Sequence, residues 1–204
     1  MVASGVEGGQ REAILNAAFE RFARYGYRRT SLGDIADAAG LSRPALYHYF
    51  RNKEDVFQAL SQRINRGVVA AVTEAAQQPG DTQARLTAVL EARAGWAFDL
   101  LHASEHGREL IDEKNRLCGA AGAEANAAFV DLLERILARG KAKGEISLAA
   151  IGLSAREAAL FLTDSIEGVI GKETVEATAR KRLRILTQLF VRGLRPHTRA
   201  DAAA

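Results

Sequence analysis

The sequence predicts an all-α protein of about nine helices, with an N-terminal three-helix domain containing a helix-turn-helix and a C-terminal helical domain. Apolar residues recur at helical spacing along most of the chain, and no stretch shows the alternation typical of a β-strand. We expect residues 8–68 to form the first domain and residues 69–197 the second. Residues 1–7 and 198–204 are expected to be disordered.

The first helix is expected from Arg11 to Tyr25, and Gly26 ends its pattern. This helix would supply the core against which the next two helices pack. Residues 1–10 are glycine-rich and lack periodicity, which favours a disordered arm. The apolar positions of the helix are Ile14, Leu15, Ala18, Phe19, Phe22 and Ala23.

A helix-turn-helix follows. Ser31 can cap the first of its two helices, and Asp34 places a carboxylate near the same free amides. Donating a hydrogen bond to a DNA phosphate is a second, compatible role for Ser31. Gly40 ends this helix, and Ser42 and Pro44 begin the next one, since proline lacks an N–H that the first turn does not need. The buried face of the first helix would be Leu32, Ile35, Ala36 and Ala39.

The second helix of this motif carries more aromatic surface than a solvated helix would. Leu46 and Phe50 share one face, while Arg43 can bond a guanine edge and Ala45 can contact a thymine methyl group. Lys53 offers a positive charge to a phosphate. The candidate DNA contacts are Thr30, Ser31, Ser42, Arg43, Pro44, Ala45, Tyr47, His48, Tyr49 and Lys53.

The residues from Thr30 onward, with the core DIADAAGLSRPALYHYFRNKEDVF, resemble the DNA-binding domain of the TetR family of transcriptional repressors. The portion LYHYFRNK, Leu46–Lys53, is highly specific to that family. The resemblance covers residues 11–68, and the remainder matches in length and helical character. Gly33 departs from the pattern, because some members carry a base-contacting side chain at its place.

Composition fits a soluble regulator. There is no signal peptide and no apolar run of about 18 residues, so we expect a cytoplasmic protein without membrane contact. The single cysteine excludes an intrachain disulfide. Residues 1–53 carry eight Lys or Arg against five Asp or Glu, whereas residues 54–204 carry 20 of each. This surplus is too small to predict nucleic-acid binding by itself.

The remaining helices follow from periodicity and turn signals. A long helix should run from Asn52 to about Gln78, where Pro79–Asp81 forms a turn. The glycines of segment 119–122 indicate a break between two of the later helices. The later helices are expected at Thr82–Leu101, Glu105–Leu117, Ala123–Ala142, Ser154–Ile170 and Val175–Leu194.

The last two helices can either complete a bundle within one chain or pair with their copies across a twofold axis. The TetR resemblance implies the second arrangement, a homodimer whose two recognition helices bind a palindromic operator. The interface residues would then be Leu162, Ile166, Leu186 and Phe190.

The resemblance also implies a small-molecule site in the middle helices, whose occupation releases DNA. We expect a mostly apolar ligand and no cofactor. Packing in an ordinary core is the alternative for each candidate residue. The pocket candidates are Trp96, Phe98, Leu100, Phe129, Leu133 and Phe161.

Two other function classes stay open beside the repressor. His102 and His106, with Glu105 between them, could hold zinc in a small hydrolase, although a solvated charged face is the simpler interpretation. An α-helical adaptor that binds a protein through its basic end is the other class. Cys118 could sense oxidation if exposed, or be an inert buried thiol.

Overall fold

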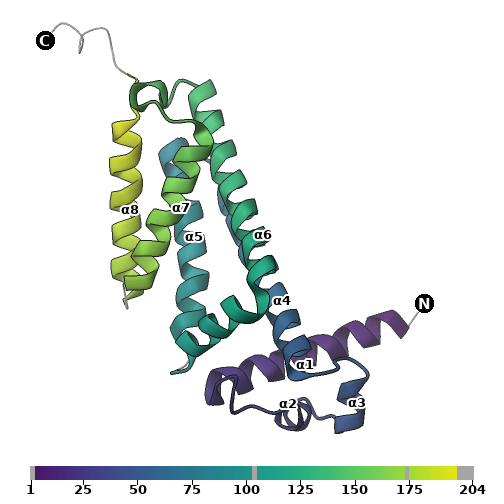
Figure 1. Cartoon of the computed structure of the whole chain (residues 1–204). Helices are drawn as coiled ribbons and strands as arrows, with labels where there is room; N and C mark the ends of the chain where they lie inside the picture. Colours follow the sequence, from purple (N-terminus) through teal and green to yellow (C-terminus); the bar gives the residue numbers. More distant parts are fainter. Residues whose placement is uncertain (1–2, 103–104, 173–174, 197–204) are drawn as a thin grey trace, which may run out of the picture. The chain divides into compact units, whose positions relative to one another are not determined.

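The computed structural model describes residues 3–102, 105–172 and 175–196. These residues contain α-helices and one short 3-10 helix, η1, and no β-strand, which confirms the predicted all-α class (Figure 1). The elements are α1 Ala3–Tyr25, α2 Leu32–Ala38, α3 Arg43–Tyr47, α4 Lys53–Gln77, α5 Thr82–His102, α6 Gly107–Ala142, η1 Ala149–Ile151, α7 Ala155–Lys172 and α8 Glu176–Gly193.

The described residues hold eight α-helices where the sequence predicted about nine. The difference lies in α6, in which two helices meet at a kink at Cys118, at φ −127° and ψ 21°, one residue before the predicted break in segment 119–122. The glycines there add no loop between the two helices, because an isolated glycine costs a helix only about 1 kcal/mol.

Helix α1 begins at Ala3, so residues 3–10, where the sequence predicted a disordered arm, are helical. Once a helix has nucleated, each added residue gains a backbone hydrogen bond, so the amphipathic segment from Arg11 extends toward the N-terminus despite its glycines. Residues 198–204 lie outside the described residues.

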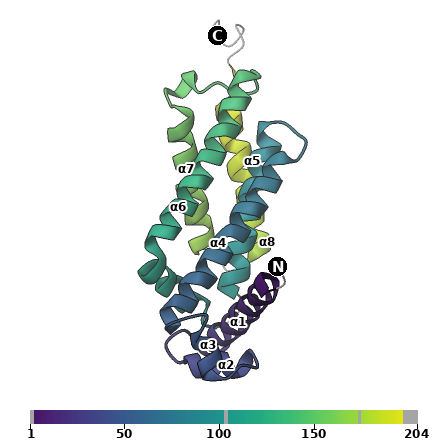
Figure 2. The same ribbon diagram turned by 90° about the vertical axis from the view of Figure 1, so that its right-hand side faces the viewer.

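The chain divides into two compact units. The first unit comprises Met1–Arg66 and Asp99–Ala123, and the second comprises Gly67–Phe98 and Glu124–Ala204. Helices α1, α2 and α3 of the first unit stay side by side in two perpendicular views (Figures 1 and 2). The first half of α6, which the sequence grouped with the C-terminal domain, belongs to the first unit.

Aromatic rings form the centre of the first unit. Phe22, Tyr27 and Phe57 contact one another with ring centroids 4.9 to 5.5 Å apart, mostly edge to face. Leu110 and Cys118 of α6 join the same buried cluster. The kinked half of α6 is therefore part of the hydrophobic core beneath the helix-turn-helix.

Two carboxylates of α6 bind the loop between α1 and α2. The backbone N–H of Arg28 donates to Glu109 Oε1 at 3.1 Å. Glu113, whose side chain is 6% exposed, accepts from Arg28 Nε at 3.3 Å and from Arg116 Nε at 2.7 Å. These bonds and the neighbouring positive charges lower the pKa of Glu113.

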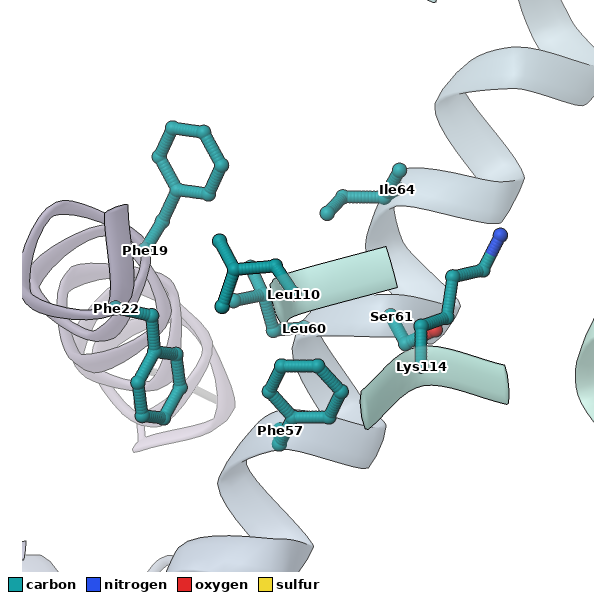
Figure 3. Close-up of a pocket in the computed structure, with 8 residues that line it drawn as sticks. All are labelled: Phe19, Phe22, Phe57, Leu60, Ser61, Ile64, Leu110 and Lys114. Atoms are coloured by element: carbon teal, nitrogen blue, oxygen red, sulfur yellow. The ribbon is translucent and has the colours of Figure 1, made fainter. Parts of the chain in front are cut away.

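A small apolar cavity of about 20 Å³ lies between α1, α4 and α6 (Figure 3). Its walls are Phe19, Phe22, Phe57, Leu60, Ile64 and Leu110, with Lys114 and Ser61 as the polar members. The residue Ser61 is 3% exposed, and its hydroxyl oxygen has no hydrogen-bond partner. The cavity thus leaves one buried polar group unsatisfied, because its other neighbours are almost all hydrocarbon.

The second unit is a helical bundle with its own core. Leu90 of α5, Leu133 of α6 and Leu162 of α7 are fully buried together. The hydroxyls of Thr87 and Thr187 are 2.7 Å apart and join α5 to α8. Within the described residues, no helix combines the length and apolar character needed to span a bilayer.

Replacing Ser61 by alanine should raise the free energy of unfolding by about 1 kcal/mol, because it removes the unsatisfied hydroxyl from an apolar cavity. Chemical denaturation measures this change. Ser165→Ala is the matched control: Ser165 is also helical, but its hydroxyl donates to Phe161 O at 2.7 Å. If both substitutions changed the free energy of unfolding by the same amount, the higher helix propensity of alanine alone would explain the change.

Glu113→Gln should lower the free energy of unfolding by about 1 to 3 kcal/mol at neutral pH, since the buried carboxylate loses its charge-assisted hydrogen bonds to two largely exposed arginines. Because folding lowers the pKa of Glu113, its stabilisation is complete above the ordinary glutamate pKa of about 4.3 and disappears as pH falls through the folded value. The difference between wild type and variant should therefore shrink in acid. A difference that is the same at every pH would contradict this role. Glu12→Gln, which removes an exposed pair with Arg63, is the control.

Candidate nucleic-acid interface

A capping box fixes the start of α2. The backbone N–H of Asp34 donates to Ser31 Oγ at 3.2 Å, and the backbone N–H and hydroxyl of Ser31 donate to Asp34 Oδ2 at 2.8 and 2.7 Å. These bonds lower the pKa of the Asp34 carboxyl. The predicted capping role of Ser31 is confirmed, and its side chain also stays exposed to solvent.

The turn that follows sets the direction of α3. Gly40 has φ +67°, a left-handed conformation that ends α2 at little cost for glycine. The Ser42 hydroxyl accepts from the Ala45 N–H at 3.3 Å, and Pro44 lies in the first turn. Behind this helix, Leu46 is fully buried, and Phe50 just beyond it is 3% exposed. Together these contacts orient a helix of only five residues.

The outer face of α3 and of the turn after it holds most of the sequence-predicted contacts. Arg43, Pro44 and His48 are exposed, and Tyr47 is 55% exposed. The remaining predicted contacts in this stretch, Ala45 and Tyr49, are half-buried. The structure therefore brings a guanidinium, an imidazole and a phenol to one solvent-facing surface. All of these are hydrogen-bonding groups that bind DNA bases or phosphates.

Gly33 makes room for the Arg43 side chain. A Cβ atom at Gly33 would lie 2.5 Å from Arg43 Nη2 and 2.7 Å from Cζ. The guanidinium thus lies directly against the backbone of α2. The sequence carried a signal for this contact, namely the glycine that departs from the family pattern, but did not show what occupies the space.

Thr30 and Lys53 bond within the first unit. Thr30 is 3% exposed, and its hydroxyl donates to the carbonyl of Gly26 at 2.8 Å. The Lys53 ammonium donates to the carbonyls of Tyr27 and Arg28 at 2.8 and 3.3 Å and lies 4.4 Å from the Tyr27 ring centroid. Burial lowers the pKa of Lys53. Both side chains hold the loop that precedes Ser31.

The pocket candidates occupy different environments, and all of them except Leu100 belong to the second unit. Phe98, Phe129 and Leu133 belong to its buried core. Trp96 is half-buried, and its ring lies against the backbone of Gly67. The side chain of the remaining α5 candidate, Leu100, lies outside the described part of the chain. The last candidate, Phe161, is 55% exposed.

A largely buried cation adjoins these core residues. The Arg93 guanidinium lies 4.2 Å from the Phe129 ring centroid and donates to Asn126 Oδ1 at 2.9 Å. Its ion pair with Glu167 is long, at 3.8 Å, and the side chain of Glu167 is 60% exposed. Burial lowers the pKa of Arg93. Sequence reasoning did not select Arg93, because a single arginine in an amphipathic helix carries no pattern.

The interface candidates on α7 and α8 divide into two groups. Leu162 and Ile166 are fully buried within one chain and have no surface left for a second copy. Leu186 and Phe190 are half-buried at the edge of the core. The exposed apolar residues of the two helices are instead Leu160, Phe161, Ile185 and Leu189, and the ring of Phe161 stacks on that of Phe190 at 6.3 Å. The predicted helical period was correct. The helix face that the sequence assigned to the dimer interface is the face that packs into the chain's own core.

The metal candidate is described only in part. His106 Nε2 lies 2.9 Å from Arg29 Nη2, and His106 Nδ1 lies 3.7 Å from Glu109 Oε2. The His102 side chain lies outside the described residues. Across the residues that are described, no three His, Cys, Asp or Glu side chains group as a metal site would require. Cys118 is 7% exposed, which favours the inert thiol.

The helix-turn-helix segment of the chain is similar to that of known proteins. Residues 14–60 match the family model for bacterial regulatory proteins of the tetR family. The chain is 35% identical over 106 residues to the transcriptional activator FasR of Mycolicibacterium smegmatis, an alignment spanning 52% of this chain and 47% of FasR. It is 43% identical over 53 residues to the transcriptional repressor ComR of Escherichia coli, spanning 26% of this chain and 25% of ComR. The chain thus spans half or less of the length of these relatives.

Structural comparison extends over nearly the whole chain. A transcriptional regulator of the TetR/AcrR family from Thermobifida fusca superimposes with a TM-score of 0.69 at 25% identity, covering 92% of this chain and 100% of the other. The stretch that the family model matches, residues 14–60, contains the capped α2, the turn at Gly40 and the exposed α3. Residues 14–60 are thus similar to the tetR family of bacterial regulatory proteins, and the fold of the whole chain resembles that of a TetR/AcrR-family regulator.

Proposed function

We propose that this protein is a sequence-specific DNA-binding transcriptional regulator that acts as a homodimeric repressor on a palindromic operator. The observation that carries the proposal is the outer face of α3, where Arg43, Tyr47 and His48 are exposed while Leu46 is fully buried behind them. A short helix fixed in this way can enter the major groove of B-DNA. A repressor acts by occupying its operator, so repression needs no protein surface besides the one that binds DNA. The protein would act in the cytoplasm, with the DNA.

Different residues would serve different parts of DNA recognition. Arg43 would donate two hydrogen bonds to a guanine edge and so select sequence. Ser31, Tyr47 and His48 would bond phosphates, which fixes the register without selecting bases. Lys53 would position these groups by holding the preceding loop through its bonds to backbone carbonyls. Thr30 would act in the same way. The other proposed contacts are Ser42, Pro44, Ala45 and Tyr49.

A dimer follows from the requirements of recognition and from an exposed apolar surface. One five-residue helix contacts few base pairs, and two copies related by a twofold axis would bind both halves of a palindrome. Phe161, Ile185 and Leu189 are 55, 45 and 64% exposed on α7 and α8. Contiguous apolar surface marks an interaction site in soluble proteins, and the stacking of Phe161 on Phe190 joins the exposed residues of α7 to those of α8. We assign it to the second copy of the chain, with Leu186 and Phe190 at its inner edge.

The second unit would hold the effector. A small molecule releases DNA only if it binds the DNA-incompetent state more tightly than the competent one. The aromatic and aliphatic residues near Phe129 suit a mostly apolar molecule. Arg93 is largely buried, and its ion pair with Glu167 is long at 3.8 Å, so it suits an acidic group on the same molecule.

Footprinting of the purified protein on its own upstream DNA tests the function. We expect a protected palindrome whose affinity falls with salt, bound by a protein with the mass of a dimer. An absence of sequence-specific protection at low salt, in protein freed of bound small molecules by unfolding and refolding, would overturn the proposal and favour an adaptor.

Leu189→Glu should convert the dimer into monomers, because it places a charge in the apolar interface, and should reduce operator affinity strongly. Sedimentation equilibrium measures the mass. Ile151→Glu is the control, since Ile151 is 47% exposed outside α7 and α8. A Leu189→Glu protein that remains dimeric would contradict the assigned interface.

Gly33→Ala should alter base preference without loss of stability. The added methyl displaces the mobile end of Arg43, while alanine favours the helix by up to about 1 kcal/mol over glycine. Arg43→Ala should cost about 1 to 3 kcal/mol of discrimination at one base pair, measured by binding to single-base operator variants. The double variant should lose little more than Arg43→Ala alone.

Gly122→Ala serves as the control for this pair, because a Cβ atom there meets no other atom within 4 Å. If Gly33→Ala retains the wild-type base preference, then the position of the Arg43 guanidinium against α2 is irrelevant to recognition.

A further inference from the structure

A polar pocket of about 320 Å³ lies beside the recognition helix, within the first unit. Three segments form it: the early part of α1, the end of α3 with the turn after it, and the first turns of α4. The lining residues are Arg11, Tyr47, His48, Tyr49, Phe50, Arg51, Asp55, Gln58, Ala59 and Gln62. Tyr47 and His48 are already proposed as DNA contacts, so the pocket continues that surface toward α1.

The side chains that line the pocket carry a net positive charge. Asp55 is the sole acidic residue among its lining residues, and its Oδ2 atom accepts from the backbone N–H of Arg51 at 3.2 Å and from Arg51 Nε at 3.1 Å. That pair is neutral as a whole. Arg11 and His48 therefore supply the remaining capacity to bind an anion, with the amide of Gln62 as a further donor.

Arg11 is held in place by an aromatic ring instead of a carboxylate. Its guanidinium carbon lies 5.1 Å from the ring centroid of Phe50, a residue that is 3% exposed and fixed in the core. No ion pair among the described residues includes Arg11. This contact keeps the guanidinium beside the pocket, and no carboxylate competes with an incoming anion for its N–H donors.

The location identifies the anion. A helix in the major groove has a sugar-phosphate strand along each wall of the groove, and proteins bind these strands with arginine, tyrosine and amide groups. The pocket adjoins the end of α3 and offers those donor types. We propose that it binds a backbone phosphate at the edge of each operator half-site, with Arg11 as the principal cation.

This inference rests on the proposed DNA-binding function and adds α1 to the interface. The sequence did not indicate it, because Arg11 stands at the start of a helix whose pattern is that of a core element. Its place beside His48 depends on how α1 packs against α3 and α4, which local spacing does not reveal.

The test compares Arg11→Gln with Arg24→Gln. Both arginines are exposed on α1, and each lies over an aromatic ring, Phe50 for Arg11 and Tyr25 at 5.3 Å for Arg24. Arg24 is about 20 Å farther along the helix. The two variants therefore remove the same charge and the same kind of contact, one inside the pocket and one away from it.

Operator affinity of each full-length dimer is measured over about 50 to 200 mM salt. Arg11→Gln should reduce the slope of log K against log salt by about 1.8, since two phosphates are lost per dimer at about 0.9 each. It should weaken binding to the operator and to its single-base variants by the same factor. Arg24→Gln should leave the slope unchanged, and Arg11→Lys should restore most of it.

Ethylation interference locates the phosphate directly. With wild-type protein, ethylation of one phosphate at each outer edge of the palindrome should inhibit binding, and with Arg11→Gln that interference should vanish. An unchanged slope and interference pattern in Arg11→Gln, or equal losses in both variants, would overturn the inference while the DNA-binding function stands. A wild-type protein without specific operator binding would overturn both.

Discussion

The direction of α3 depends on the burial of two side chains, Leu46 and Phe50. A helix of five residues has no independent stability, because nucleation is unfavourable and few backbone hydrogen bonds offset it. Its position therefore comes from its caps at Ser42 and Gly40 and from the core formed with α1 and α4. Phe50 contributes twice, since its inner surface packs in that core while its ring also supports the guanidinium of Arg11. One buried aromatic residue thus orients both the helix and a charged group beside it.

The loop before Ser31 is constrained from two sides. Lys53 of α4 bonds its carbonyls, and Glu109 and Glu113 of α6 bond the N–H and the guanidinium of Arg28. Residues 107–123 of α6 belong to this unit, while residues 124–142 of the same helix belong to the unit that would hold the effector. The carboxylates that bond the loop therefore belong to the same unit as the helix-turn-helix itself.

Local rules predicted much of this molecule. The capping box at Ser31, the turn at Gly40 and the burial of Leu46 depend on neighbouring residues, so the sequence contained them in full. Long-range packing decided the rest. The spacing of apolar residues defines the apolar stripe of α7 but does not show which edge of the stripe faces the chain's own core. In the structure Leu162 is buried in that core, while its neighbour Phe161 is exposed. Thr30 and Lys53 were assigned to DNA by their position in a motif, which did not reveal that their side chains bond the carbonyls of Gly26 and Tyr27. The contacts of Gly33 with Arg43 and of Arg11 with Phe50 also required three-dimensional structure.

If the protein binds DNA as proposed, its charge distribution would concentrate the affinity in a few groups. The net charge is +3, and residues 54–204 carry equal numbers of acidic and basic side chains, so the general field of the protein attracts DNA weakly. Many basic residues are also occupied by carboxylates, as Arg51 is by Asp55 and Arg63 by Glu12. Binding at cellular salt would then rely on the few cations outside such pairs at the α3 surface, chiefly Arg11 and Arg43. Few phosphate contacts imply weak non-specific binding, and the base contacts of α3 would provide a larger share of the affinity for an operator than in a strongly basic protein.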